Sequence, residues 1–214
     1  MEPTQESLQE PVVEAEKTAS PVAGDETTKK DKRRKPISYV AEVLIYLALI
    51  FACVYVVPNY VVQRTVVSGK SMQDTLQNKD SLLVDKLSYR FTNPKRYDII
   101  VFYPKGKDVN EYFVKRIYGL PGETVQIKDN DIYINGEIIS DPYAKDSMST
   151  AGIAEEPITL GEDEFFVLGD HRSVSLDSRY DETLDPDGPG PVKKENIAGK
   201  VFFRIWPLSS FGKP

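Results

Sequence analysis

The stretch "DIYINGEII", residues 131–139, indicates the fold class of this chain. Short runs rich in Ile and Tyr lie on both sides of Asn135-Gly136. Asn-Gly is a preferred pair for a two-residue type I′ turn, because both residues tolerate the positive φ angles that this turn requires. Two short strands joined by such a turn form an antiparallel hairpin. We therefore predict antiparallel β-structure around this turn.

The same pattern recurs along the chain after Thr65. Runs rich in β-branched and aromatic residues alternate with turn residues, and no long run has helical periodicity. The other predicted strands are "SLLVD" (81–85), "DIIVFY" (98–103), "FVKRIYG" (113–119), "TVQIK" (124–128), "FFVLG" (165–169) and "KVFFRIW" (200–206). We predict a mainly β domain, an antiparallel barrel or a pair of packed sheets. Residues 141–158 and 181–196 have no clear period and are predicted to be surface insertions.

A polar tail and a basic cluster form the N-terminal region, residues 1–36. Residues 1–28 are rich in Glu, Thr, Pro, Ser and Ala and contain almost no large apolar side chain. Such a segment cannot bury enough surface to offset its ordering entropy, so we predict that it is disordered. Six Lys and Arg residues follow between positions 29 and 35.

An apolar segment, residues 37–63, is predicted to be a single transmembrane anchor. Residues 43–62 contain no charged side chain, and this is about the length that a helix needs to cross a bilayer. The run is longer than the apolar core of a cleavable signal peptide, so an uncleaved anchor is favoured. Pro58 should end or kink the helix. The basic cluster predicts a cytoplasmic N-terminus and places residues 64–214 outside the cell membrane.

Composition excludes several kinds of site. The net charge of −6 gives no indication of a nucleic-acid partner. Cys53 is the only cysteine, so an intrachain disulfide is impossible. His171 is the only histidine, and no cysteine cluster accompanies it, so a metal site built from these ligands is excluded. We expect neither a metal nor a cofactor.

Lys115 is a candidate general base in the predicted strand 113–119. In a strand, Phe113, Lys115 and Ile117 share one face. Such a lysine either extends its amine to water or is desolvated, and desolvation lowers its pKa towards neutrality. A neutral amine can take a proton from a serine. Ser71, next to the permissive backbone of Gly69, is a candidate nucleophile, although serines in such loops are commonly plain turn residues.

Four sequence blocks carry a resemblance to a known family. They are "SGKSMQDTL" (68–76), "RYDIIVF" (96–102), "VKRIYGLPGE" (114–123) and "GDHRSVSLDSR" (169–179). In this order, behind a membrane anchor, they resemble the motif blocks of bacterial type I signal peptidases, in the Gram-positive form with one anchor. The resemblance spans most of residues 37–206. It implies a membrane-bound serine endopeptidase that removes signal peptides from secreted preproteins, with the β fold shared with self-cleaving bacterial repressors.

The resemblance also implies roles for individual residues. Ser71 matches the nucleophile, Lys115 the general base, and Ser175 the serine that orients the lysine amine by a hydrogen bond. The supporting residues that it implies are Met72, which packs near the site, the ion pair of Asp177 and Arg179, and Asp170 and Arg172, which hold the loop.

Three positions depart from the family pattern. Asp74 stands where proline is usual, and His171 stands where asparagine is usual. Gly69 occupies the position where some members carry a serine that donates to the oxyanion. A Ser-His-Asp triad of His171 with Asp170 is rejected, because adjacent residues on a strand point to opposite faces.

Two other functions were weighed against this one. A catalytically weak or silent relative that acts in envelope-protein or pilus assembly is favoured slightly by Asp74 and His171, but the presence of Ser71 and Lys115 weighs against it. A self-cleaving regulator is disfavoured by the anchor and by the lack of a DNA-binding segment. The expected partners are secretory preproteins with small residues before the cleavage site, and membrane lipid.

Overall fold

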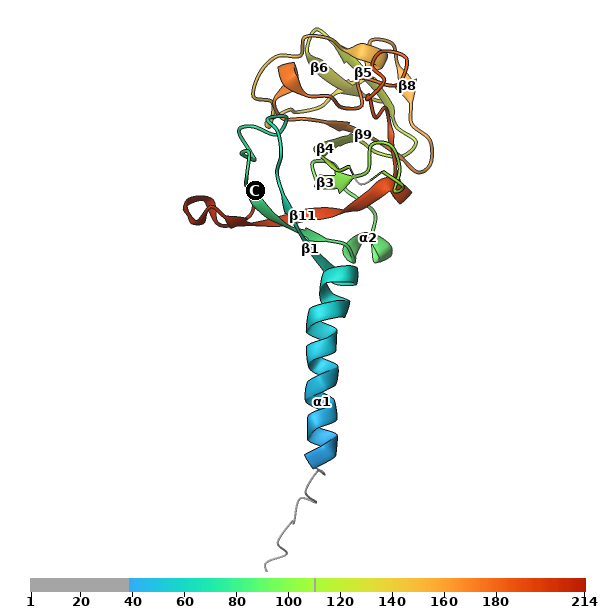
Figure 1. Cartoon of the computed structure of the whole chain (residues 1–214). Coiled ribbons are helices and arrows are strands. Elements are labelled where there is room, and N and C mark those ends of the chain that lie inside the picture. The colour runs from blue at the N-terminus through green and yellow to red at the C-terminus, as the bar shows by residue number, and fades with distance from the viewer. Residues whose placement is uncertain (1–38, 110) are drawn as a thin grey trace, which may run out of the picture. The chain divides into compact units, whose positions relative to one another are not determined.

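The computed structural model describes residues 39–109 and 111–214 of the 214-residue chain (Figure 1). The predicted tail and basic cluster, residues 1–36, lie outside the described residues.

The described chain begins with an apolar helix. It consists of α1 (Tyr39–Phe51) and a continuing π-helical segment, η1 (Ala52–Val61). Together they form the single helix in residues 39–109 and 111–214 that is long and apolar enough to cross a membrane, with a mean hydropathy of 2.6. Pro58 lies inside η1. A proline cannot donate to the carbonyl four residues earlier and its ring crowds that oxygen, which accounts for the departure from α-helical geometry near this residue.

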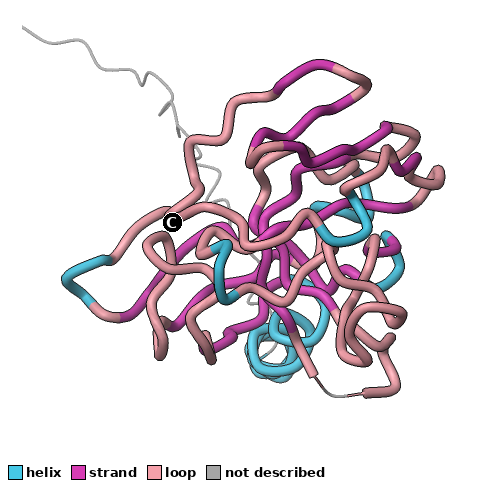
Figure 2. The backbone as a smooth tube through the Cα atoms, turned by 90° about the horizontal axis from the view of Figure 1, so that it is seen from above, coloured by secondary structure: helices cyan, strands magenta, loops and turns pink. Residues whose placement is uncertain are grey.

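The remaining chain forms two antiparallel sheets, which confirms the mainly β prediction. The larger sheet has the order β1-β2-β11-β3-β4-β9-β10 and the smaller one the order β7-β6-β5-β8. Tight turns and longer loops, some of which contain a short helical turn, join the strands (Figure 2). The larger sheet consists of β1 (Val62–Val66), β2 (Ser81–Asp85), β3 (Ile99–Phe102), β4 (Phe113–Gly119), β9 (Glu164–Leu168), β10 (Val192–Lys193) and β11 (Ile197–Trp206). The smaller sheet consists of β5 (Thr124–Lys128), β6 (Asp131–Ile134), β7 (Glu137–Ile138) and β8 (Ile158–Thr159).

Five short helical turns complete the domain. They are α2 (Ser88–Phe91), η2 (Gly152–Ala154), η3 (Arg172–Val174), η4 (Lys194–Asn196) and η5 (Leu208–Ser210). Each has only three or four residues, so the strands and loops determine where the functional side chains lie.

The hairpin predicted from "DIYINGEII" is confirmed. Strands β6 and β7 pair with Ile134 opposite Glu137. Asn135 and Gly136 have φ angles of 53° and 83°, so both turn residues adopt the positive φ of a type I′ turn.

Two predicted surface insertions contain structure that the sequence pattern did not reveal. Residues 181–196 include β10, where Val192 is buried and pairs with Phe165 of β9. Residues 141–158 include the buried Ala154 and the first residue of β8. The prediction of plain insertions was wrong at these places, because strands of two residues are too short to show a period. Strand β1, which begins directly after Val61, was also missed.

Apolar side chains cover both faces of β4. Ile117 packs in one cluster with Ile100 and Val167, whereas Tyr118 packs in another with residues of the smaller sheet. A third cluster contains Met72, Leu76, Leu82 and Val101. It holds the chain that follows β1 against the larger sheet. Since neither face of β4 is open to water along its second half, any polar side chain there must be buried.

We expect Gly199→Ala to destabilise the domain by about 1–3 kcal/mol through overpacking. Gly199 lies in β11, and a Cβ atom there would overlap the main-chain oxygen of Asp85 on β2. Urea unfolding of the two proteins measures the difference. Gly161→Ala is the matched control, because its Cβ would meet only the flexible end of Glu164. Equal losses for the two variants would contradict this account of β11.

Candidate active site

Ser71 lies on a turn that follows edge strand β1. Gly69 has a φ of +114°, a conformation that side chains disfavour, so glycine permits the turn just before the serine. Beyond Ser71, the side chains of Met72 and Leu76 are buried in the core. The turn is closed by main-chain hydrogen bonds from Val67 N–H to Asp80 O (2.8 Å) and from Leu76 N–H to Met72 O (2.7 Å). Ser71 is thus presented by a short turn that is fixed on both sides.

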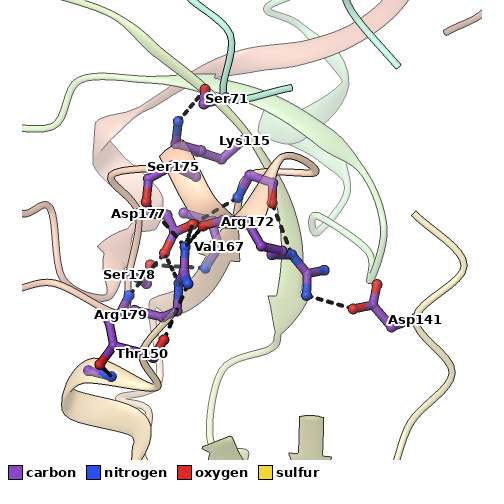
Figure 3. A network of polar contacts seen from close by, with 12 residues as sticks. Ser71, Lys115, Asp141, Thr150, Val167, Arg172, Ser175, Asp177, Ser178 and Arg179 are labelled. Atoms are coloured by element: carbon purple, nitrogen blue, oxygen red, sulfur yellow. Dashed lines mark hydrogen bonds and ion pairs between the residues drawn. The ribbon is translucent and has the colours of Figure 1, made fainter. Parts of the chain in front are cut away.

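Lys115 reaches Ser71 from the interior of the larger sheet. It lies on β4, opposite Ile100 of β3. Its Nζ donates a hydrogen bond of 2.6 Å to Ser71 Oγ, as Figure 3 shows. The structure therefore brings together the two residues that the sequence singled out as nucleophile and base, although 44 positions separate them.

The amine of Lys115 is desolvated. The residue is only 4% exposed, and Nζ lies 5.3 Å from the centre of the Phe113 ring. Burial lowers the pKa of Lys115 to about 8, because the charged form loses its hydration. Asp177 opposes this effect, Arg179 adds to it, and Asp170 opposes it again. Of the two alternatives left open by the sequence, the desolvated amine is the one observed.

Asp177 and Arg179 form the ion pair that the sequence resemblance implied. Arg179 Nε lies 2.8 Å from Asp177 Oδ1, Nη2 lies 3.0 Å from Oδ2, and both side chains are fully buried. Arg179 Nη2 also donates to the main-chain oxygens of Arg172 and Ser175. Asp177 accepts from Gly169 N–H at 3.0 Å. The pair thereby ties the two ends of residues 169–179 together (Figure 3).

Ser175 is buried beside this network, but its expected contact is not observed. Among the described residues its Oγ has no hydrogen-bond partner, so no bond to the Lys115 amine is present. A Cβ atom on Gly169 would overlap both Ser175 Oγ and the main-chain oxygen of Ser71. Gly169, which sequence reasoning did not single out, thus lets these two segments approach each other. The orienting role of Ser175 stays a prediction.

Asp170 and Arg172 each pair with a residue outside their own block. Asp170 accepts two hydrogen bonds from Arg116, at 2.9 and 2.7 Å, and one from Thr75 Oγ1 at 2.5 Å. Arg172 lies 2.6 Å from Asp141 and donates to Gly169 O at 3.0 Å. The sequence analysis did not single out Thr75 or Arg116, because neither contact with Asp170 follows from a local pattern.

His171 contacts the turn that carries Ser71 through its main chain and its ring. It does not form a triad with Asp170 and Ser71. Its N–H donates to Ser71 O at 3.0 Å, and its Nδ1 lies 3.3 Å from Lys70 O. Its Nε2 lies 3.7 Å from Asp146. The carboxylate of Asp170 is held by Arg116 and Thr75 instead.

An open cleft of about 710 Å³ adjoins the serine–lysine pair. One side consists of the end of β1 and the turn to Met72, and the other of residues 111–115. Val174 and Leu176 complete the lining. Within residues 39–109 and 111–214 there is no group of three or more His, Cys, Asp or Glu side chains that could hold a metal ion. The chemistry available here is that of a hydroxyl and an amine with a lowered pKa beside an open cleft.

Comparison with known proteins defines the class to which this domain belongs. The family described as "Signal peptidase, peptidase S26" matches residues 38–206. The chain is 36% identical over 196 residues to a signal peptidase I of Bacillus caldolyticus, covering 86% of this chain and 97% of that protein. It is 34% identical over 158 residues to a probable signal peptidase I-2 of Synechocystis sp., covering 72% of this chain and 67% of the relative. The chain also matches the crystal structure of a signal peptidase I from Enterococcus faecalis V583, with 32% sequence identity and a TM-score of 0.40. The match covers 51% of this chain and 97% of that chain. The chain belongs to the signal peptidase family, peptidase S26, and is a serine peptidase.

We expect Lys115→Met to stabilise the fold at pH 7 while it removes the candidate base. The free lysine pKa is 10.5, and the folded value of about 8 corresponds to on the order of 3 kcal/mol. The folded protein loses this proton near pH 8 and the unfolded chain only near pH 10.5. The free energy of unfolding of the parent protein therefore increases as the pH rises from 8 to 10.5. This gain is lost again as the pH falls back to 8.

Urea unfolding at several pH values measures this effect. The stability advantage of the methionine variant should be largest below pH 8 and should shrink towards pH 10.5. Lys128→Met, which changes an exposed lysine on β5, is the control and should show no such trend. A Lys115→Met protein that is less stable than the parent at pH 7 would contradict the desolvated amine.

Proposed function

We propose that this protein is a signal-peptide-removing endopeptidase in which Ser71 is the nucleophile and Lys115 the general base. The observation that carries the proposal is the 2.6 Å contact between Ser71 Oγ and a buried amine with a pKa of about 8. A lysine with this pKa is neutral in an appreciable fraction of molecules near neutral pH and can accept a proton. The same contact disfavours a catalytically silent role.

The reaction follows from this geometry. Neutral Lys115 takes the Ser71 hydroxyl proton while Oγ attacks the scissile carbonyl carbon and forms a tetrahedral intermediate. The resulting ammonium gives that proton to the leaving amine, the C–N bond breaks, and an acyl-enzyme remains. Lys115 then takes a proton from water, the hydroxide attacks the ester, and the amine returns the proton to Ser71 Oγ as the signal peptide leaves.

Gly69 has no side chain and cannot give the oxyanion a side-chain donor, and its main-chain N–H already donates to Asn78 Oδ1 at 3.2 Å. The main-chain N–H of Ser71 is the proposed donor. One donor of this kind contributes about 3 kcal/mol to the rate.

The cleft adjoining Ser71 would hold the cleavage segment of a preprotein. Strand β1 is an edge strand of the larger sheet and contributes Thr65 and Val66 to the cleft, and Val67 follows directly after it. An extended peptide can add to such an edge through main-chain hydrogen bonds, while its alternate side chains enter pockets. Small residues at alternate positions match the A-x-A pattern that precedes signal-peptide cleavage sites. In this proposal, Met72 helps to fix the turn, and Asp177 and Arg179 fix the loop behind Lys115.

The apolar helix α1–η1 is proposed to anchor the enzyme in the cell membrane. Its length and composition suit a single span, and the basic cluster at residues 29–35 favours a cytoplasmic N-terminus. Residues 64–214 then form the extracytoplasmic catalytic domain. Anchoring raises the effective concentration of enzyme and preprotein in one membrane, with lipid as the surrounding partner.

We expect Ser71→Ala and Lys115→Ala each to reduce cleavage of a preprotein to near background, and the double variant to be no worse, since the two groups act as one unit. Lys115→Arg should fail as well, because a guanidinium stays protonated. His171→Asn should remain within roughly tenfold of the parent. The measurements are kcat and KM, with thermal melting as the test of folding.

The pH profile adds a second criterion to the same assay. The parent rate should rise with pH through the Lys115 pKa of about 8. Activity in Lys115→Ala together with an inactive His171→Asn would show that a different base is used.

Membrane orientation is tested by protease added to intact cells. The proposed orientation predicts digestion of the domain after Arg64 and protection of the N-terminal tail, because only the domain is outside. An epitope tag at each end reports the two fates separately. A protected domain and a digested tail would reverse the orientation.

A further inference from the structure

Residues 141–148 form a loop that touches both chain segments around Ser71. Lys145 lies 3.2 Å from Asp74 on the nucleophile turn, and its N–H donates to Asp170 O at 2.8 Å. The carboxylate of Asp146 lies 3.7 Å from Nε2 of His171. Two adjacent loop residues thus face two positions that depart from the usual family pattern.

Both contacts join groups of complementary polarity, and the first is an ion pair. Lys145 meets the carboxylate of Asp74, and the carboxylate of Asp146 meets an imidazole. Lys145 Nζ also lies 3.5 Å from Gln73 Oε1, so it spans two neighbouring residues of the turn. Asp74 is 75% exposed, and solvent-exposed pairs contribute little to stability. The pairs are therefore better suited to fix the position of the turn than to hold the fold together.

His171 connects this loop to the serine itself. Its main-chain N–H donates to Ser71 O at 3.0 Å, and its ring lies beside Lys70 O. Asp146 also accepts from Ser173 N–H at 3.2 Å, which fixes the chain on the other side of the histidine. Asp146 is therefore connected to the main chain of Ser71 through a single residue, His171.

The loop has a rigid base. Asp141 pairs with the buried Arg172 at 2.6 Å, as Figure 3 shows, and it accepts from Tyr118 OH at 2.6 Å. Tyr143 stacks over the guanidinium of Arg116 at 3.7 Å. These contacts hold the loop against β4, the strand that carries Lys115.

We propose that Lys145 and Asp146 are positioning residues, which set the Ser71 main chain against Lys115 through Asp74 and His171. The inference rests on the proposed Ser71–Lys115 chemistry. A nucleophile displaced by a fraction of an ångström loses rate without losing substrate affinity. The four residues then act as one unit.

The first experiment is a double-mutant cycle with Asp146→Asn and His171→Asn in the full-length protein in detergent. The substrate is a synthetic peptide with Ala-x-Ala before the cleavage site. Asp146→Asn should lower kcat by roughly three- to tenfold with KM unchanged, and it should have no further effect in the His171→Asn background. The acidic limb of the pH profile should stay near 8, because the loop does not act on the Lys115 amine.

The second experiment exchanges the charges of the other pair. Asp74→Lys and Lys145→Asp should each lower kcat, and the double variant should recover most of the loss. Asp187→Asn is the matched control, because it breaks an exposed lysine–aspartate pair in another loop and should leave kcat unchanged. Thermal melting should be equal for all these variants.

These measurements separate the two proposals. An active parent with an inactive Ser71→Ala variant supports the serine chemistry in the same assay. With an active parent, three results would each overturn the positioning role alone. The first is an unchanged kcat in both Asp146→Asn and Lys145→Asp, the second is additive effects in the double-mutant cycle, and the third is no recovery of kcat in the charge exchange. Cleavage by Ser71→Ala at the parent rate would overturn both.

Discussion

The burial of one amine is the constraint on which the rest of this site depends. In the proposed mechanism, Lys115 is a base near neutral pH only while its charged form is poorly hydrated, and the apolar side chains that cover both faces of β4 remove that hydration. A solvated lysine at the same distance from Ser71 would hold its proton. If Lys115 has this role, the core of the domain contributes to the chemistry, and the enzyme gives up folding stability to keep the amine buried.

The carboxylates of Asp177 and Asp170 raise the pKa of Lys115, but they do not restore it to its usual value. Asp177 is bound by Arg179, and Asp170 by Arg116, so neither carboxylate is free to form a direct ion pair with Lys115. Buried ion pairs contribute little net stability, because desolvation offsets their attraction. The two ion pairs instead fix the position of residues 169–179 behind Lys115. This segment contacts the turn that carries Ser71 at two places, Asp170 with Thr75 and His171 with Ser71.

The chain runs from the apolar helix to the turn that carries Ser71 through strand β1 alone. The apolar helix ends at Val61 and β1 begins at Val62. Ser71 lies ten positions after Val61, so it is at most about 35 Å of extended chain from the helix end. Thr65 and Val66 at the end of the intervening strand, and Val67 just after it, line the cleft. In the proposed arrangement, a peptide that emerges from the bilayer would meet the edge of β1 and the Ser71 hydroxyl within this distance.

The sequence by itself determined the apolar helix, most strands, the Asn135-Gly136 turn, and the pairing of Ser71 with Lys115. These depend on local patterns or on motif blocks, which are readable along the chain. Only the tertiary structure decided the partners of Asp170 and Arg172, the approach allowed by Gly169, and the short strands β8 and β10. The contacts of Lys145 and Asp146 also belong to this group. The contacts join residues that are distant in the chain, and the two strands contain too few residues to show a period. Both therefore depend on how the sheets pack.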